Sequence, residues 1–259
     1  MVNADGVDIQ LGADNVVVAD AIEIEFTSAG PVMTFGAHRP TRHCAHWSRA
    51  AVVRTERIGN VSKTVLYMSM SVDGFIAGPN VAPGNGLGDG GQRLHEWFLP
   101  DADPEHRTGS HLTGVNREVM DEAMATGAVV VGRRTFEFAD GWGGDHHDGV
   151  PIFVLSRHQP DPQPPWPGVT YVRDVTAAMS RAKAAAGDQN VLVHGARTAR
   201  LALAAGVLDE LRIHLVPVLL GQGERLFEDM PPDHIELELL GAVDGPGVVH
   251  LRYRVRTAD

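Results

Sequence analysis

From about residue 63 onward, short apolar runs alternate with segments of helical spacing. Apolar runs bounded by turn residues predict strands at 64–71, 128–131, 151–156, 169–172, 190–193 and 211–220. Helical spacing predicts helices at 92–99, 116–126, 134–138, 174–186 and 198–205. We expect Asn116 and Asp174 to cap two of these helices, and Gly187 to end the helix that Asp174 begins.

The last part of the chain has a different pattern. Residues 235–240 and 248–256 alternate with period two on either side of Asp244–Gly247, which predicts a closing hairpin. Pro217 interrupts the apolar run before it and indicates a bulge or an edge at that point. Strand–helix alternation followed by antiparallel strands predicts an α/β fold, in which a mixed, mostly parallel central sheet has helices on both faces.

Residues 1–60 lack this regularity. Residues 15–26 fit a strand pair or a short amphipathic segment. A metal site at His38, His43, Cys44 and His46 is conceivable, but their spacing fits no common zinc pattern. We therefore expect a poorly ordered extension at 1–60 and a single domain at 61–259.

Composition narrows the function classes. The 259 residues are 43% hydrophobic and carry a net charge of −11, which indicates a packed soluble core and disfavours nucleic acid or anionic lipid as partners. The single cysteine excludes a disulfide within the chain and favours a reducing compartment, so we expect a cytoplasmic protein. We predict no membrane-spanning segment and no signal peptide.

Two strand-to-helix turns carry the candidate chemistry, at 128–136 and 191–199. In each, an apolar run ends in a turn of small residues and a helix starts at once. Free backbone N–H groups and the positive end of a helix then point to one place, which suits a phosphate. Two such turns together suggest one ligand with several phosphates, such as a dinucleotide.

Four segments in register resemble the dihydrofolate reductase fold, and more narrowly the reductase domain of the bifunctional riboflavin deaminase–reductase and its stand-alone bacterial relatives. They are Ser69–Gly78, Val131–Glu137, Val193–Ala196 and Leu208–Phe227. The resemblance covers roughly Lys63 to Arg256, and it implies NADPH as the cofactor. Because relatives start near Lys63, we expect that the start codon in use lies upstream of the native one.

The resemblance also implies which residues meet the cofactor. The nicotinamide would lie against Ser69, Ile76, Ala77 and Gly78. The phosphates and the 2′-phosphate ribose would meet Gly132, Arg133, Arg134 and Thr135, with Leu155, Ser156 and Arg157 completing the 2′-phosphate site. The pyrophosphate would face Gly195, Ala196, Arg197 and Thr198, where relatives often have more glycine.

The arginines fit this assignment on physical grounds. A 2′-phosphate carries about two charges, and guanidinium groups bind it bidentately. A cation at a helix N-terminus is unfavourable by up to roughly 1 kcal/mol unless an anion is bound. The alternative is that these arginines are solvated residues at helix starts.

We expect the substrate to bind at Asp89, Trp97, Leu220 and Gly221. Asp89 either hydrogen-bonds a ring N–H or caps the helix that follows, and Trp97 either stacks on a flat substrate or packs in the core. Asp145–Asp148 looks metal-like, but adjacent histidines in a glycine loop are more often solvated, so we predict no metal.

Hydride transfer to a C=N or C=O group also needs a proton. Dihydrofolate reductases use one acid on the helix before the second strand. Here that helix offers Glu118, Asp121 and Glu122, none clearly in the matching place, whereas Asn116 is closer. Asp121 and Glu122, with Asp89, remain weak catalytic candidates that surface charge also explains.

The sequence leaves three hypotheses. The first is an NADPH-dependent reductase of a small heterocycle or related compound, resembling the pyrimidine reductase of riboflavin synthesis. The second is dihydrofolate reductase activity, which the unmatched acid disfavours. The third is an NADPH-binding module without turnover. We expect a homodimer because such relatives commonly pair through the sheet region.

Overall fold

A computed structural model describes the strands 22–27 and 30–35 by their backbone, and residues 62–99, 112–158, 166–230 and 234–256 in full. The chain divides into two compact units, Met1–Glu56 and Arg57–Asp259. In the first, β1 (Ile22–Thr27) and β2 (Gly30–Phe35) form an antiparallel hairpin. The sequence predicts a strand pair within residues 15–26, whereas the hairpin lies later in the chain, at 22–35. The four candidate metal ligands from His38 to His46 lie outside the described residues.

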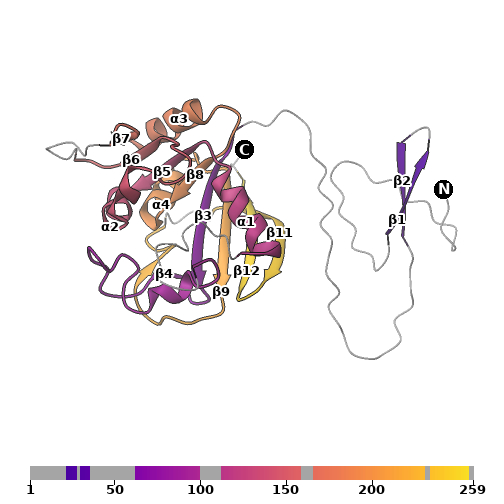
Figure 1. Cartoon of the computed structure of the whole chain (residues 1–259), viewed down its shortest axis with the longest axis horizontal. Helices are drawn as coiled ribbons and strands as arrows, with labels where there is room; N and C mark the ends of the chain where they lie inside the picture. Colours follow the sequence, from indigo (N-terminus) through magenta and orange to yellow (C-terminus); the bar gives the residue numbers. More distant parts are fainter. Residues whose placement is uncertain are drawn as a thin grey trace. The chain divides into compact units, whose positions relative to one another are not determined.

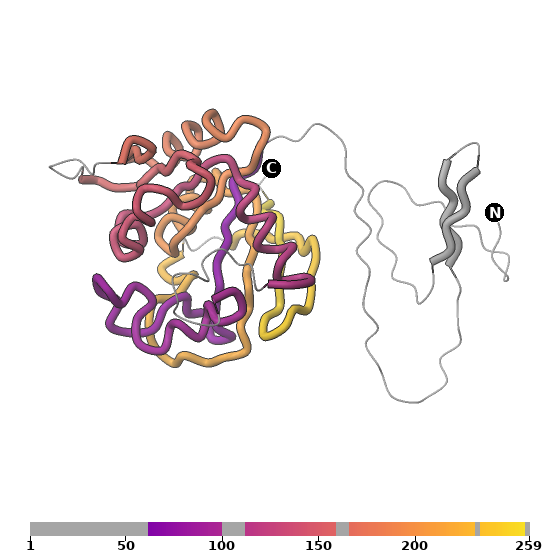
Figure 2. Tube along the Cα trace, in the orientation of Figure 1, coloured from indigo at the N-terminus to yellow at the C-terminus, as the bar shows by residue number. Residues whose placement is uncertain are grey.

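The second unit is built on an eight-stranded sheet with the order β11-β12-β9-β3-β8-β5-β6-β7. Neighbours from β9 to β7 are parallel, whereas β12 pairs antiparallel with β9 and with β11. The indigo β3 runs through the middle of this unit, with the yellow β11–β12 pair at one edge (Figure 2). The strands are β3 (Thr64–Ser71), β5 (Ala128–Gly132), β6 (Ile152–Leu155), β7 (Val169–Val172), β8 (Val191–His194), β9 (Glu210–Val216), β11 (Leu237–Gly245) and β12 (Val248–Val255).

Helices cover both faces of the sheet (Figure 1). Buried residues of α3 (Val175–Ala186) and α4 (Ala196–Ala204) share one core cluster with alternate residues of β3, β5 and β8. The other face packs against α1 (Gly114–Met124) and α2 (Arg133–Phe138). Two short 3₁₀ helices, η1 (Gly91–Leu94) and η3 (Asp140–Gly144), lie in the loops, and β4 (Phe75–Ala77) pairs with β10 (Glu224–Arg225).

The predicted α/β class with a mostly parallel sheet and a C-terminal antiparallel hairpin is confirmed. Strong local signals predicted both ends of α3 correctly. The Asp174 carboxylate accepts a hydrogen bond from the Ala177 backbone N–H at 2.8 Å, and Gly187 ends the same helix at φ 65°.

Three predicted elements were wrong in extent. The strand expected at 211–220 ends at Val216, because Pro217 has no N–H to continue the ladder. The hairpin strand expected at 235–240 extends to Gly245, with a register shift between Leu239 and Gly241. The helix expected at 92–99 is one short 3₁₀ turn, Gly91–Leu94.

A buried ionic cluster lies between α1 and the β9–β12 part of the sheet. The Glu210 carboxylate, 2% exposed, accepts from Lys63 at 2.7 Å and from Arg212 at 3.1 Å. Arg212 and Arg252 also pair with Glu122. Burial alone would raise the pKa of Glu210, but Lys63 and Arg212 lower it more, so the group stays ionised.

Replacing Glu210 with alanine is expected to destabilise the protein by about 3–5 kcal/mol, because Arg212 would be left as a buried charge without this partner. Chemical denaturation at neutral pH measures the loss. Glu238→Ala is the matched control, because Glu238 pairs with Arg254 at 2.9 Å in a more exposed place and should cost about 1 kcal/mol or less.

The same variant has a pH signature. Since folding lowers the pKa of Glu210, its contribution is present above the unfolded value of about 4.3 and is lost as pH falls through the lower folded value. The stability difference between wild type and Glu210→Ala should therefore shrink in acid. Equal losses for Glu210→Ala and Glu238→Ala would contradict the assignment of a buried cluster.

Candidate functional site

The predicted cofactor turns come together at the carboxyl ends of neighbouring parallel strands. Val131 of β5 is in register with His194 of β8, and Gly132 is in register with Leu155 of β6. From β5 the chain continues through α2 to β6, and from β8 it continues through α4 to β9, on the opposite side in the sheet order. Such a topological switch point is where open α/β sheets bind ligands.

The two turns also contact one another. A Cβ at Gly195, whose φ is +89°, would lie 2.8 Å from the Thr135 hydroxyl oxygen. A Cβ at Gly132 would lie 3.0 Å from the Thr198 hydroxyl oxygen. That Thr198 oxygen is buried and has no hydrogen-bond partner. A buried hydroxyl without a partner, at the start of the nine-residue helix α4, fits a site that holds an acceptor-rich group.

The arginines surround these turns at the surface. Arg133 is exposed and pairs with Glu137 one helical turn away, at 2.9 Å. Arg134 is 61% exposed and lies over the Phe138 ring at 5.5 Å. Arg157 is exposed directly after β6, where the buried Ser156 hydroxyl bonds to the backbone of His158. The arginines of adjacent strand ends are therefore accessible to an anion.

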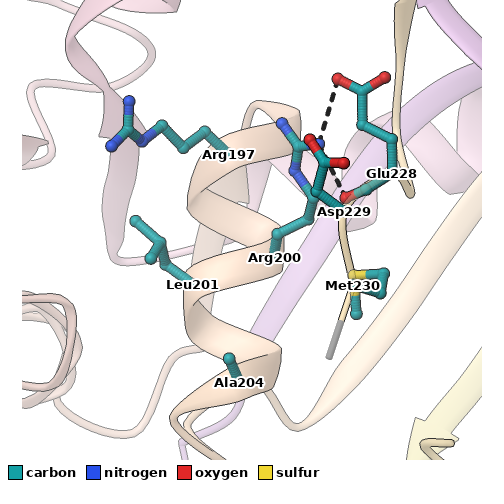
Figure 3. A pocket seen from close by; sticks show the side chains of 7 residues that line it. All are labelled: Arg197, Arg200, Leu201, Ala204, Glu228, Asp229 and Met230. Carbon is teal, nitrogen blue, oxygen red and sulfur yellow. Dashed lines mark hydrogen bonds and ion pairs between the residues drawn. The ribbon is translucent and has the colours of Figure 1, made fainter. Parts of the chain in front are cut away.

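A pocket of about 500 Å³ borders α4 and residues 228–230 (Figure 3). Arg200 closes one side by donating to the Glu228 backbone oxygen at 3.0 Å, whereas Arg197 points away from that pair (Figure 3). Arg197 is the member of the predicted cofactor set that lines this pocket. The pocket therefore lies along α4 and residues 228–230, and its lining residues do not come from β5 or β6.

The predicted nicotinamide residues are close-packed. Ser69, Ile76 and Ala77 are buried, and the Ser69 hydroxyl accepts from the Trp97 indole N–H at 2.9 Å. A Cβ on Gly78 would meet the Asp89 backbone oxygen at 1.9 Å, so only glycine fits there. The structure thus brings Trp97 and the Asp89 loop against the segment predicted to face the ring.

The remaining substrate candidates are held by loop contacts. The Asp89 carboxylate is exposed and accepts from Asn80 at 2.6 Å and from Asn85 at 3.0 Å. The backbone N–H groups of Leu220 and Gly221 donate to Asp73 at 3.1 and 2.8 Å. Hydrogen bonding by Ser71 and these N–H groups lowers the pKa of Asp73, so the carboxylate that binds residues 220–221 stays ionised.

The two acids of α1 that were catalytic candidates make ion pairs. Asp121 is exposed and accepts from Arg117 at 2.8 Å. Glu122 accepts from Arg252 at 3.1 Å and also pairs with Arg212, inside the ionic cluster described above. These ion pairs hold the two carboxylates against arginines of α1, β9 and β12.

Asn116 was wrongly predicted as an N-cap, because α1 starts at Gly114 and Thr113 has the capping position. Asn116 is instead buried within the first turn. Its amide nitrogen donates to the backbone oxygens of Trp97 at 3.3 Å and Pro246 at 3.2 Å, and its amide oxygen lies 3.0 Å from His250 Nε2. The helix begins two residues earlier than predicted, at Gly114. Asn116 therefore lies within its first turn, and its side chain is buried.

Asn116 orders two buried histidines that sequence reasoning missed. Because its amide oxygen can only accept, His250 carries its proton on Nε2. Burial lowers the pKa of His250 to about 4, so its Nδ1 is then an acceptor for His214 Nδ1 at 2.9 Å. Both rings pack against Trp97, at 5.0 and 4.9 Å between centroids. The wall beside Ser69 is therefore aromatic and uncharged.

A second histidine group lies at the end of β8. His146 contacts His147 between Nδ1 atoms at 2.7 Å and His194 between Nε2 atoms at 3.1 Å. The histidines expected to be solvated at 145–148 are half-buried, because η3 packs Trp142 on His146 at 4.7 Å. Among the residues that the structure describes, no group of histidines, cysteines and acids is arranged to hold a metal ion.

With the fold and site in view, comparison with known proteins gives the family. The model of the RibD C-terminal domain matches residues 62–251, and the chain belongs to this family. Family membership makes it an oxidoreductase domain that acts on a small molecule. No curated protein matches the chain, and no helix among the described residues is long and apolar enough to span a membrane.

Solved structures show the same fold at low identity. A putative riboflavin biosynthesis protein from Shewanella sp. PV-4 is 18% identical with a TM-score of 0.55, and the match covers 75% of this chain and 99% of that one. A pyrimidine reductase-like protein from Corynebacterium diphtheriae is 14% identical with a TM-score of 0.52, covering 77% and 94%. The chain also matches 57% of a deaminase/reductase from Thermotoga maritima, at 12% identity, a TM-score of 0.50 and 75% of its own length.

Replacing Asn116 with aspartate is expected to destabilise the fold by about 1–3 kcal/mol. An ionised carboxylate cannot donate to the Trp97 and Pro246 carbonyls. Chemical denaturation at about pH 8 measures the effect.

Asn190→Asp is the matched control, since the Asn190 side-chain oxygen accepts from the Lys63 backbone N–H at 3.1 Å and aspartate keeps that acceptor. It should change stability by less than about 0.5 kcal/mol. If Asn116→Asp is as stable as wild type, the amide is not needed as a donor at this position.

Proposed function

We propose that this chain is an NADPH-dependent reductase that transfers a hydride to a small heterocyclic or related substrate, like the pyrimidine reductase step of riboflavin synthesis. The observation that carries the proposal is the pair of facing β–α turns with the buried, unpartnered Thr198 hydroxyl between them. The family and the names of the Shewanella, Corynebacterium and Thermotoga proteins support the same class of reaction.

The residues present fit a reduced dinucleotide. The backbone N–H groups at the start of α4, with the Thr198 and Thr135 hydroxyls, would hold the diphosphate. Arg133, Arg134 and Arg157 would bind the 2′-phosphate, with Ser156 and Leu155 forming the floor at the end of β6. The nicotinamide would lie toward Ser69, Ile76 and Ala77, where Trp97 covers the β3 side.

The bound cofactor would supply the hydride, and the chain would supply placement and the exclusion of water. Ile76, Ala77 and Leu226 are buried and the Asp89 loop packs on Gly78, so this end of the sheet is closely packed. The neutral wall of Trp97, His214 and His250 favours an uncharged, flat substrate over a cationic one, because within the described part of the chain no carboxylate is hydrogen-bonded to these three side chains.

The two other hypotheses differ from this one in testable ways. Folate reduction is disfavoured because an amide and two neutral imidazoles occupy the region in which folate-type reductases carry an acid. A binding module without turnover would bind NADPH but never oxidise it in the presence of a substrate panel that includes pyrimidine compounds. We further propose a cytoplasmic homodimer, and a single-chain mass by sizing chromatography would contradict the dimer.

Arg133→Ala and Arg157→Ala are each expected to raise the dissociation constant of NADPH by about tenfold, equivalent to roughly 1.4 kcal/mol. Each loses a guanidinium contact to the 2′-phosphate, so the affinity for NADH, which lacks that group, should change by less than about threefold. Fluorescence titration of the reduced nicotinamide with both cofactors measures the ratio.

Arg181→Ala is the control, because Arg181 makes the same change of charge on the exposed side of α3. It should leave both affinities unchanged. Equal weakening by all three variants would indicate a general charge effect, and no weakening by Arg133→Ala and Arg157→Ala would overturn the arginine assignment.

A further inference from the structure

The side-chain amide of Asn116 fixes the proton positions of two buried histidines. Its nitrogen faces the backbone oxygens of Trp97 and Pro246, and a reversed amide would turn an oxygen toward both of these acceptors. The amide oxygen therefore faces His250 Nε2 at 3.0 Å and accepts a hydrogen bond from it. Because a neutral imidazole carries one N–H proton, Nδ1 of His250 has a lone pair.

His214 has the complementary form. Its Nδ1 lies 2.9 Å from the lone pair on His250 Nδ1, so it must donate, and Nε2 of His214 is left as an acceptor. Within the described part of the chain no hydrogen bond is made to this Nε2, although His214 is only 6% exposed. Burial, with His250 and Arg212 adding, holds the pKa of His214 well below its usual value, so the acceptor stays unprotonated at neutral pH.

A buried donor without a partner lies near this acceptor. The centroid of the Tyr67 ring is 6.3 Å from that of His214, and Tyr67 is 4% exposed. Among the described residues the Tyr67 hydroxyl has no hydrogen-bond partner, and the Arg212 guanidinium lies over the face of the ring. Buried polar groups are paired in nearly all native structures. An unused acceptor and an unused donor in one place therefore indicate a site for a ligand that carries both.

Close packing holds the two imidazoles in this arrangement. A Cβ at Gly245 would lie 2.2 Å from the Asn116 amide oxygen and 3.0 Å from His250 Nε2, so a side chain at this end of β11 would break their hydrogen bond. The Trp97 ring packs on both imidazoles. These contacts oppose a flip of either ring, so the acceptor on His214 is held in a fixed place.

The same contacts join His214 to the residues expected to meet the substrate and the nicotinamide. His214 is in register with Ser69 on the neighbouring strand β3, and the Ser69 hydroxyl accepts from the Trp97 indole. Trp97 contacts the His214 ring directly and packs in one cluster with Leu220. The open acceptor is thus connected to three of the residues that the proposed function assigns to the site.

We propose, on the basis of the proposed function, that His214 Nε2 and the Tyr67 hydroxyl recognise the substrate by an N–H group next to a carbonyl group. The substrate N–H donates to His214 Nε2, and the substrate carbonyl oxygen accepts from Tyr67. An uncharged heterocycle with such an edge satisfies both groups, whereas an N-alkylated ring leaves the buried acceptor unpaired. His214 and Tyr67 determine specificity, and Asn116 and His250 are positioning residues that set the proton of His214.

The proton positions can be measured without cofactor or substrate. In a long-range ¹H–¹⁵N NMR spectrum of histidine-labelled protein at neutral pH, we expect Nδ1 of His214 and Nε2 of His250 to be protonated. His214→Phe assigns the signals by removing one ring, and His234, 87% exposed, is the reference for a ring in solvent. A proton on Nε2 of His214 would overturn the recognition role, because the ring would then have no acceptor to offer.

Binding of two matched pyrimidines tests the recognition itself. Uracil has N–H groups next to carbonyl groups, and 1,3-dimethyluracil has the same ring without an N–H. With saturating NADPH, wild type is expected to bind uracil more tightly by about tenfold or more. His214→Phe keeps an aromatic ring on Trp97 and should bind both compounds within about threefold. Tyr67→Phe, which lacks only the hydroxyl, should weaken uracil binding by about threefold or more, and His234→Phe should match wild type.

The outcomes separate this inference from the proposed function. A preference for uracil that persists in His214→Phe would be steric and would rule out the role of Nε2, and unchanged uracil binding by Tyr67→Phe would rule out the role of Tyr67. If wild type binds NADPH but neither pyrimidine, the recognition is wrong and the reductase assignment stands. Absence of NADPH binding by wild type would overturn the proposed function, while the proton positions remain measurable.

A further measurement applies if His214→Phe does not fold. The ¹⁵N shift of wild-type His214 Nε2 then decides, because it moves when this nitrogen accepts a hydrogen bond. Movement with uracil but not with 1,3-dimethyluracil supports the recognition, and no movement with either contradicts it.

Discussion

The position of β8 beside β5 is the constraint on which the site depends. The two strands are parallel and in register to their carboxyl ends, but the chain leaves them in opposite directions along the sheet. Right-handed crossovers in opposite directions place the following helices on opposite faces, which opens the space between the turns. Gly132 can then approach Thr198 while Gly195 approaches Thr135, so each turn has a small residue where the other has a hydroxyl.

The sheet face under α1 is divided into two chemical layers. Along β9, Glu210, Arg212 and His214 project to the same face, and Arg252 and His250 lie opposite the last two on β12. The charges pair among themselves at the Glu210–Arg212 level. One step nearer the carboxyl end, burial together with His250 and the positive charge of Arg212 holds the pKa of His214 well below its usual value. The ionic layer thus stabilises the fold and keeps the next layer neutral.

How much the sequence predicts depends on the range of the interactions. The strands 64–71 and 169–172 and the cap at Asp174 follow from neighbours within a few residues, and the structure has them where they were expected. The histidine groups do not, since His250 meets Asn116 across 134 residues and His146 meets His194 across 48. His214 did carry a signal, because it shares the period-two face of β9 with two charged residues in an otherwise apolar strand.

One half of the site is positively charged and the other is neutral. The net charge of −11 affects how the charged half can bind an anion. Exposed arginines lie on the β5, β6 and α4 side, whereas the β3 and β9 side has neutral imidazoles and Trp97. The dinucleotide that we propose carries several negative charges and would be repelled by the molecule as a whole, so its affinity would have to come from short-range contacts at the turns. Local contacts are little weakened by salt, while the long-range repulsion is screened. The neutral half then has no anion to hold and suits an uncharged ring.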